Sequence, residues 1–357
     1  MDQAVRRGAW ICGIVVLLAG TWHGQRTPAA ETSFADRIKA LSEPEGVFDT
    51  DNLISNEGSY LEVVPALIDG QVTGGAYVGV GPDQNFSYIA RIKPATAYII
   101  DIRRDNLLLH LLFKALFEES PTRLAYLSLL TGRAPPAPDV RSPRLATLQE
   151  LIDQVDRAER SARPVREQDI EDRIRGFGVP LSSRDLDTIK RFHGAFVGAG
   201  LNLRFRSHGR PPREFYPTLR ELLLATDREG RQWSYLASDE AYQFVRDLQM
   251  RNAIIPVVGD LSGSHAMRAI GAALAGSGEP LSAIYVSNVE DYLFRTVAFA
   301  RFSDNLNRLP RTPRSMLIRS MFRGGPSVSQ LQRVDELMAG LANGKYRTYS
   351  ELIYGRR

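Results

Sequence analysis

A glycine turn and an acidic residue follow two apolar runs early in the chain, at a spacing that is typical of nucleotide sites. Gly79 and Gly81 permit a tight turn at the end of the first run, Tyr77–Val80, and a helix predicted at Asn85–Ile92 would direct its N-terminus toward a ligand. Asp101 lies 20 residues beyond Gly81, at the end of the second run. A carboxylate there can accept hydrogen bonds from a ribose diol, so the segment predicts a nucleotide-type site.

Polar residues at the ends of two later runs could join that site. Asp260 follows the β-branched run Ala253–Val258, and Asn288 follows the run Leu281–Ser287. In an open parallel sheet the ligand crevice lies at the carboxyl ends of the strands. All of these residues, distant in sequence, are therefore predicted to converge at one edge of a sheet.

The segment after the fourth run carries the best candidates for reactive groups, namely Asn288, Glu290 and Tyr292. Asn288 could hold a polar group of a substrate, and Glu290 or Tyr292 could move a proton if suitably desolvated. The alternative is a helix start, in which Asn288 caps the helix, Glu290 favours the positive end of its dipole and Tyr292 packs. The sequence leaves both interpretations open.

A second polar group precedes the helix predicted at Leu61–Ile68. Asn56, Glu57 and Tyr60 could contact a ligand, whereas Asn56 or Ser59 could equally cap that helix. Helix capping also explains Ser262 or Ser264, which lie just before a helix predicted at Ala266–Ala275. These alternatives differ in whether the side chains face a ligand or the backbone.

Strands that alternate with helices favour a doubly wound, mainly parallel α/β sheet. A further strand is predicted at Met316–Ile318 and a closing helix at Val328–Leu341. Three charged, amphipathic segments between strands two and three predict a large helical insertion: Arg144–Arg160, Glu167–Phe177 and Ser183–Ala199. The expected organisation is a first part of the α/β core at 31–131, the insertion at 132–250, and the second part of the core with a C-terminal helix at 251–357.

The N-terminus resembles an export signal. Arg6 and Arg7 precede the apolar run Ala9–Ala19, and small residues follow at Thr27–Ala30. Residues 1–30 are therefore predicted to be a signal peptide, which places the mature protein in the periplasm or outside the cell. The alternative is an uncleaved membrane anchor over residues 9–22, which would be the chain's contact with a membrane.

Composition narrows the classes of function. The chain has 45 basic and 41 acidic side chains, a balance that argues against wholesale nucleic-acid binding, and the predicted partner is a small molecule. Its single cysteine, Cys12, lies in the predicted signal, so disulfides are not expected to stabilise the mature protein.

The histidines show no spacing typical of a metal site. A basic and aromatic stretch at 204–216 is predicted to be a solvated loop anchored by its aromatic residues, with recognition of an anionic ligand or partner as the alternative.

The order of the strand ends resembles the core of class I S-adenosylmethionine-dependent methyltransferases. Four segments also resemble an uncharacterised bacterial domain of unknown function with a methyltransferase-like Rossmann core: Ser55–Leu61, Tyr77–Asn106, Asn252–Asp260 and Ser282–Phe294. In the methyltransferases the glycine turn approaches the methionine part of the cofactor, the acid after strand two holds the ribose, and the acid after strand three approaches the adenine. The resemblance implies that S-adenosylmethionine is held by Gly79, Gly81, Asp101 and Asp260.

Two alternatives accompany this expectation. The glycine turn and the acid spacing also suit a dinucleotide such as NAD(P), for which Arg103 and Arg104 could contact a ribose phosphate or could instead pair with Asp101 or Asp105. The second alternative is a non-catalytic envelope protein that retained the fold and binds another small molecule or a protein, because fold alone does not establish chemistry.

Overall fold

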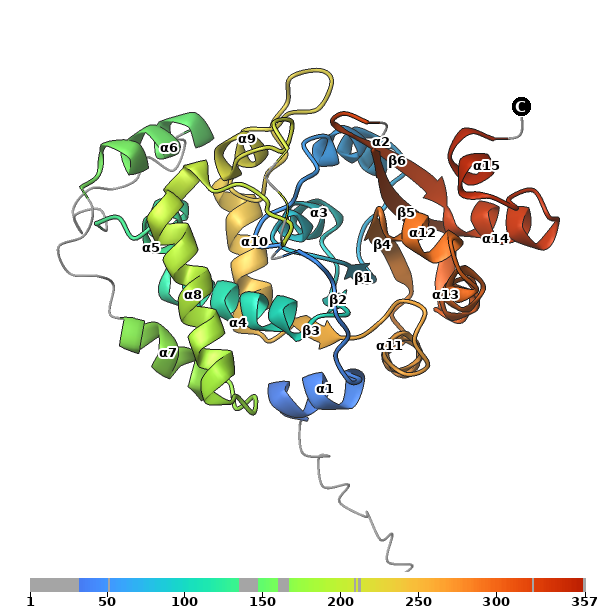
Figure 1. Cartoon of the computed structure of the whole chain (residues 1–357), viewed down its shortest axis with the longest axis horizontal. Coiled ribbons are helices and arrows are strands. Elements are labelled where there is room, and N and C mark those ends of the chain that lie inside the picture. The colour runs from blue at the N-terminus through green and yellow to red at the C-terminus, as the bar shows by residue number, and fades with distance from the viewer. Residues whose placement is uncertain are drawn as a thin grey trace, which may run out of the picture. The chain divides into compact units, whose positions relative to one another are not determined.

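Six strands form a single sheet at the centre of the protein (Figure 1). The structure, a computed structural model, describes residues 32–355 except 51, 135–146, 160–166, 209, 211–212 and 323, so the predicted export signal or anchor lies outside the described residues. The strands are β1 (Ala76–Gly79), β2 (Thr96–Asp101), β3 (Ile254–Val258), β4 (Leu281–Ser287), β5 (Arg311–Phe322) and β6 (Ser327–Arg333).

The strand order is β3-β2-β1-β4-β5-β6, and every neighbouring pair is parallel except β5 and β6, which are antiparallel. All residues of β1 and β3 are buried, as expected for parallel strands covered on both faces. The prediction of an α/β protein with a mainly parallel sheet is confirmed. The order changes direction between β1 and β4, and such a switch point is where open α/β sheets form their crevice.

Helices cover both faces of the sheet (Figure 1). On one face α10 (Asp239–Met250) packs against α3 (Gln84–Ile92) and α4 (Arg104–Glu119). On the other face α11 (Ala266–Ser277) packs against α1 (Phe34–Leu41) and α13 (Ala298–Asn307). Helices on both faces are expected where the parallel strand order runs in both directions from β1.

The described residues between β2 and β3 form helices joined by loops. They form α5 (Arg123–Leu130), α6 (Leu148–Arg157), α7 (Glu167–Gly176), α8 (Ser183–Ala199), η2 (Gly200–Asn202), α9 (Leu219–Leu223) and α10. Both α7 and α8 pack on α4, whose residues from Asn106 to Phe117 are all buried. A helix that is apolar on nearly every side needs such cover, which explains why these two helices lie against it.

The C-terminal region differs from the prediction in one element. Residues Val328–Leu341 were expected to form one helix, but 327–333 form the edge strand β6, and α14 (Val334–Ala342) begins only at Val334. Gly324, Gly325 and Pro326 make the hairpin turn from β5, which extends from Arg311 to Phe322, well beyond the predicted Met316–Ile318. The turn signal outweighs the helical spacing of the apolar residues that follow it.

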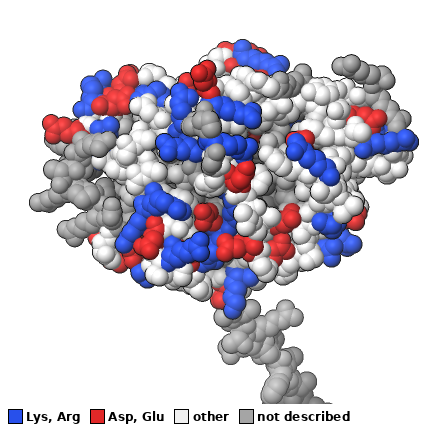
Figure 2. Space-filling view, in the orientation of Figure 1, with Lys and Arg blue, Asp and Glu red and all other residues white. Residues whose placement is uncertain are grey.

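Short elements complete the fold: η1 (Tyr60–Val63), α2 (Val64–Asp69), α12 (Val289–Phe294) and α15 (Tyr349–Tyr354). In the described part of the chain, no helix has the length and apolar character needed to cross a membrane. Basic and acidic side chains are interspersed over most of the face in Figure 2, and basic side chains gather in a band across its upper middle.

Candidate functional site

A cavity of about 440 Å³ opens at the carboxyl ends of β1 to β4. Gly81 after β1, Asp101 at the end of β2, Asp260 after β3 and Asn288 after β4 all line it. The volume is in the range of small-molecule sites, and its place at the switch between β1 and β4 is the one expected for an open α/β sheet. The structure thus brings together the residues that the sequence places at separate strand ends.

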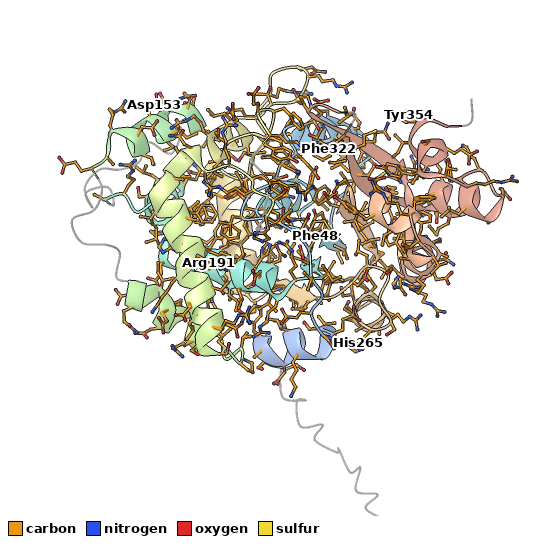
Figure 3. All side chains as sticks on the ribbon, in the orientation of Figure 1. Phe48, Asp153, Arg191, His265, Phe322 and Tyr354 are labelled. Atoms are coloured by element: carbon orange, nitrogen blue, oxygen red, sulfur yellow. The ribbon has the colours of Figure 1, made fainter. Side chains whose placement is uncertain are left out.

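Two segments outside the sheet complete the walls of this cavity. One is the approach to the core, through residues 48–50, 52 and 55–57, and the other is the basic and aromatic stretch, through residues 205, 207, 210, 213 and 216. Bridging backbone contacts between Thr50 and Ser207 hold the two segments together, and the His208 N–H donates to the Asp49 carbonyl at 2.8 Å. Figure 3 marks two aromatic side chains of the walls, Phe48 and Phe322.

The glycine turn is rigid because buried side chains support it. Gly81 has φ +83°, a conformation that favours glycine, and its carbonyl lies 2.9 Å from His110 Nε2. Burial lowers the pKa of His110 to about 4, so this histidine is neutral at pH 7, in agreement with its interpretation as a core residue. The Asn85 amide donates to the Val80 carbonyl at 2.9 Å and to the Pro82 carbonyl at 2.8 Å.

Gly79 contributes to packing beneath the turn. A Cβ at Gly79 would collide with the Tyr77 ring and the Asn85 side chain, and Gly79 is not among the described residues that line the cavity. Asp83 also points elsewhere: it is buried, and Tyr235 Oη donates to it at 3.3 Å. Burial raises the pKa of Asp83 to about 6.

Asp101 is held by the neighbouring Arg103. The guanidinium donates through Nε to Oδ1 at 2.9 Å and through Nη2 to Oδ2 at 2.7 Å, and the Arg103 N–H donates to Oδ1 at 2.9 Å. Arg103 also donates to the Thr50 carbonyl at 2.9 Å, while Arg104 pairs with Asp185 at 2.9 Å. Arg103 therefore forms the predicted ion pair with Asp101, whereas the partner of Arg104 is Asp185 and not Asp101 or Asp105. A carboxylate has about four acceptor positions, so Asp101 can still accept from a ligand.

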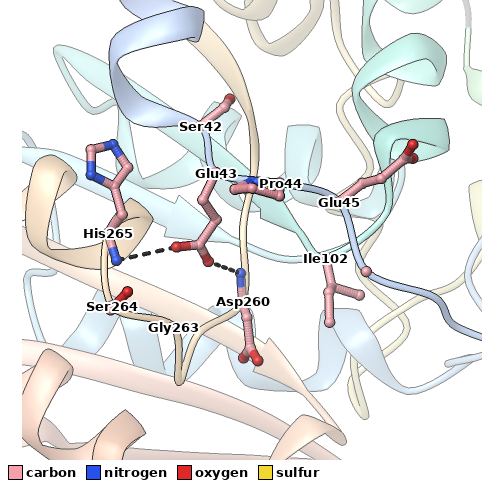
Figure 4. A pocket seen from close by; sticks show the side chains of 10 residues that line it. Ser42, Glu43, Pro44, Glu45, Ile102, Asp260, Gly263, Ser264 and His265 are labelled. Carbon is pink, nitrogen blue, oxygen red and sulfur yellow. Dashed lines mark hydrogen bonds between the residues drawn. The ribbon is translucent and has the colours of Figure 1, made fainter.

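Asp260 lies where Glu43 secures the loop before α11 (Figure 4). Glu43 Oε1 accepts from the Asp260 N–H at 2.8 Å, and Oε2 accepts from the N–H groups of His265 at 3.1 Å and Ala266 at 3.3 Å. Ser262 and Ser264 were predicted to cap this helix, but the cap is Glu43, and Ser262 Oγ is buried without a partner. In Figure 4 the Asp260 carboxylate is turned away from that of Glu43.

The segment after β4 separates the three predicted reactive residues. Asn288 lines the cavity, and its side chain makes no capping hydrogen bond to α12, contrary to the capping alternative. Glu290 does not line the cavity in the described part of the chain; it is buried in an ion pair with Arg319, with 2.5 Å between Nε and Oε2. The prediction that Glu290 faces a ligand is therefore wrong, because a buried guanidinium on β5 holds its carboxylate.

Tyr292 lies at the mouth of the cavity. Its side chain is 44% exposed and makes an edge contact with Phe48, with 5.4 Å between ring centroids. Burial and the charges of Asp49 and Asp291 raise the pKa of Tyr292 above its usual value. A phenol with a raised pKa is a poor base at neutral pH, so Tyr292 is better suited to packing on a ligand.

The polar residues predicted before the helix at Leu61–Ile68 do not all reach the cavity. Asn56 and Glu57 line the cavity, whereas Tyr60 is buried elsewhere and donates to the Leu222 carbonyl at 3.0 Å. Burial raises the pKa of Tyr60, in keeping with a structural role. Ser59 stands at the N-cap position of η1 but makes no side-chain capping bond, because its hydroxyl contacts Ser327 at 2.9 Å and Ser329 at 3.1 Å.

Glu57 is the most unusual group of the site. Its side chain is buried, and its carboxylate accepts hydrogen bonds from the hydroxyls of Tyr285, Ser287 and Ser320. No ion pair joins Glu57 to a basic residue within the described chain. Burial raises the pKa of Glu57 and the three hydroxyl donors partly oppose that rise. Ser287 reaches the carboxylate from a left-handed backbone conformation with φ +52°, which is uncommon for a residue other than glycine.

Side chains that the sequence did not indicate support Glu57 from the far side. Ser320 Oγ lies 3.3 Å from Ser329 Oγ, and Ser329 in turn contacts Ser59. Register explains the first pair, since Ser320 and Ser329 are directly opposite in the β5–β6 ladder. Because β6 was predicted to be helical, this cluster could not be found from the sequence pattern. Within the described residues there is no group of three or more potential ligands that could hold a metal ion.

Fold and site define an α/β protein with an open, mainly parallel sheet and a cavity of about 440 Å³ at its switch point. The chain belongs to a family of domains of unknown function, DUF7790, whose model matches residues 53–137 and 206–345, more than half of the chain. The matched ranges include all four strand ends at the cavity and leave out residues 138–205, which contain α6, α7 and α8. No curated protein matched the chain.

Proposed function

We propose that this protein binds a nucleoside cofactor, S-adenosylmethionine in the first instance, in the cavity at the ends of β1 to β4, and that it is a methyltransferase-like protein. The observation that carries the proposal is the convergence of Gly81, Asp101, Asp260 and Asn288 on one cavity of about 440 Å³.

The charge of the cavity supports S-adenosylmethionine over a dinucleotide. Acidic side chains outnumber basic ones along the walls: Asp49, Glu57, Asp101, Asp260 and Asp291 against Arg103, Arg210 and Arg213. Such a lining suits a sulfonium compound, which is cationic at sulfur, better than the two phosphates of NAD(P). When bound, S-adenosylmethionine supplies an electrophilic methyl group.

Different residues of the cavity would bind different parts of the cofactor. Asp101, fixed by Arg103, has acceptor capacity left for a ribose hydroxyl, and Asp260 lies at the next strand end for the base. Gly81 brings the backbone close to the ligand because it carries no side chain and adopts a positive φ. Tyr292 and Phe48 supply aromatic surface at the mouth.

Calorimetric titration with S-adenosylmethionine, S-adenosylhomocysteine and NAD(P) tests the proposal. Wild-type protein should bind the first two, and Asp101→Asn should weaken binding by about fivefold or more, the loss of roughly one charged hydrogen bond. Asp185→Asn is the matched control, since Asp185 also pairs with an arginine but lies outside the cavity lining. The absence of heat with every ligand at millimolar concentration would refute cofactor binding, and unchanged binding by Asp101→Asn would refute this placement.

A non-catalytic ligand-binding protein of the cell envelope is the second candidate. It is favoured by the engagement of Glu290 with Arg319 and by the raised pKa of Tyr292, which leave few groups free for proton transfer. Export through residues 1–30 belongs to this proposal, because S-adenosylmethionine is a cytoplasmic metabolite. Cell fractionation separates the candidates: a mature periplasmic form argues for the second, and a cytoplasmic protein for the first.

A further inference from the structure

A buried carboxyl without a cationic partner lines one side of the cavity. Glu57 is 1% exposed and is bonded to hydroxyls of β4 and β5, whereas Asp101 and Asp260 lie at the ends of β2 and β3. Hydroxyl donors compensate only part of the cost of burying a carboxylate. A cation in the adjoining cavity would compensate the rest.

A second acceptor, linked to Glu57 through Tyr285, has no donor. Gln84 lines the cavity and is 5% exposed, and its Oε1 is buried without a hydrogen-bond partner. Its Nε2 donates to Tyr285 Oη at 3.2 Å, and Tyr285 Oη donates to Glu57. This chain of hydrogen bonds uses the amide nitrogen and leaves the amide oxygen as an unsatisfied acceptor. Buried acceptors are rarely left without a donor unless a ligand or water supplies one.

Among the described residues, no basic side chain is paired with Glu57. Tyr77 on β1, Tyr88 on α3 and Tyr285 on β4 face it, and burial and the charge of Glu57 raise the pKa of each phenol. Of the three basic side chains of the cavity walls, Arg103 pairs with Asp101 and Arg210 with Asp49. The third, Arg213, lies over the ring of Phe215, 5.7 Å from its centroid. The carboxylate and the amide oxygen are therefore available to a ligand that donates hydrogen bonds and carries positive charge.

We propose that Glu57 and Gln84 form a subsite for a protonated amine, so that the second ligand of this cavity is an amine. The inference rests on the proposed function in one respect: a nucleoside cofactor at the β2 and β3 ends leaves the side toward β4 and β5 for another molecule. An ammonium group offers three donors, which the Glu57 carboxylate and Gln84 Oε1 can accept together. Phe322 and Tyr292, which also line the cavity, favour an amine with an apolar or aromatic body.

Phenethylamine and 2-phenylethanol are suitable probes because they differ only in an ammonium and a hydroxyl group. Alkylamines stay protonated below a pH of about 10. In ligand-observed NMR titrations at neutral pH, the wild-type protein should bind the amine more tightly than the alcohol. Glu57→Gln should weaken amine binding by at least about tenfold, equivalent to about 1.4 kcal/mol, and change alcohol binding by less than about threefold.

Two further variants separate the subsite from general charge and from misfolding. Asp291→Asn removes the same charge from the cavity wall, where Asp291 pairs with Arg295, and should change amine affinity by less than about threefold. Gln84→Met removes the free acceptor without a change of charge and should also weaken amine binding. Amine affinity of the wild-type protein should fall as the pH is lowered through the pKa of Glu57, while that of Glu57→Gln should stay flat.

Three outcomes would overturn the subsite: no preference of the wild-type protein for the amine, equal losses in Glu57→Gln and Asp291→Asn, or no binding of either probe. Titration of Glu57→Gln with S-adenosylmethionine keeps this result separate from the cofactor proposal. Cofactor affinity should remain within about threefold of wild type. A loss as large as that of phenethylamine would assign Glu57 to the cofactor instead, whereas amine binding without any cofactor binding would refute the cofactor proposal alone.

Discussion

At the scale of single residues, burial without a counter-charge distinguishes Glu57 and Asp83 from the other carboxylates. Both have pKa values that burial raises, and in both cases hydroxyl donors partly oppose the rise. Glu290 is equally buried but is paired with Arg319. Unpaired buried carboxyls lower stability when ionised, and such groups are retained where they serve a ligand or a neighbouring structure.

Asp83 allows this cost to be measured. Its pKa is about 6 in the folded protein against 3.8 for an ordinary aspartate, so its folded state is favoured when protonated. The stability it contributes is complete below pH 3.8 and is lost as the pH rises through about 6. Asp83→Asn should therefore raise the free energy of unfolding at pH 7 by roughly 1–3 kcal/mol.

Urea unfolding at several pH values checks this expectation. The gain from Asp83→Asn should vanish below pH 4, where wild-type Asp83 is protonated in both states. Asp169→Asn, on the exposed face of α7, serves as a control that should be neutral within about 0.5 kcal/mol. A gain that is independent of pH would show that hydrogen bonding to Tyr235, and not ionisation, sets the effect.

At the scale of elements, the sequence predicted the central strands well and the edge poorly. Continuous apolar runs located β1 to β4, and β4 has the predicted bounds Leu281–Ser287, because strands buried on both faces need apolar residues at every position. The edge strand β6 is only partly buried, so its pattern is weak and a helix was predicted in its place. The serine cluster behind Glu57 depends on β6 and was missed with it.

Contacts between distant segments were also beyond the sequence. A glycine turn or an acid at a strand end follows from local pattern, but the pairing of Glu290 with Arg319 depends on the register of β4 and β5. The contact of Glu43 could not be predicted from local pattern either. Its carboxylate accepts from the backbone N–H of His265, which is 222 residues away in sequence. Local capping by Ser262 or Ser264 was the natural prediction because such caps are frequent.

The Glu43 cap should be worth about 1–2 kcal/mol, since it satisfies backbone N–H groups of the loop and of α11 and places a negative charge at the helix N-terminus. Glu43→Gln should lower the free energy of unfolding by that amount in urea titrations. Glu45→Gln, two residues away and exposed, should have little effect. Equal losses in both variants would point to general charge, and no loss in either would show that water replaces the cap.

At the scale of the whole molecule, the helices outside the family match are part of the core and not an appendage. Residues 138–205 lie outside the matched ranges, yet Ile174 of α7 and Ile189 of α8 are buried beside Leu112 of α4. The other face of α4 packs on β2 and β3, whose ends carry Asp101 and lead to Asp260. Loss of α7 and α8 would therefore expose the helix that supports one half of the cavity.

This arrangement predicts a single cooperative unfolding transition. Ile189→Ala should cost about 2–4 kcal/mol, because it leaves a cavity between α4, α7 and α8. The unfolding midpoint should shift equally in two measurements, far-UV circular dichroism and the fluorescence of Trp233. Dichroism reports on the whole fold, and the Trp233 ring centroid lies 5.0 Å from the Arg91 guanidinium of α3. Lys190→Ala, next in sequence and exposed, is the matched control and should shift neither signal by more than about 0.5 kcal/mol. Separate dichroism and fluorescence midpoints in Ile189→Ala would contradict this expectation. The helices between β2 and β3 would then form an independent folding unit, and the Asp101 side of the cavity would not depend on their contact with α4.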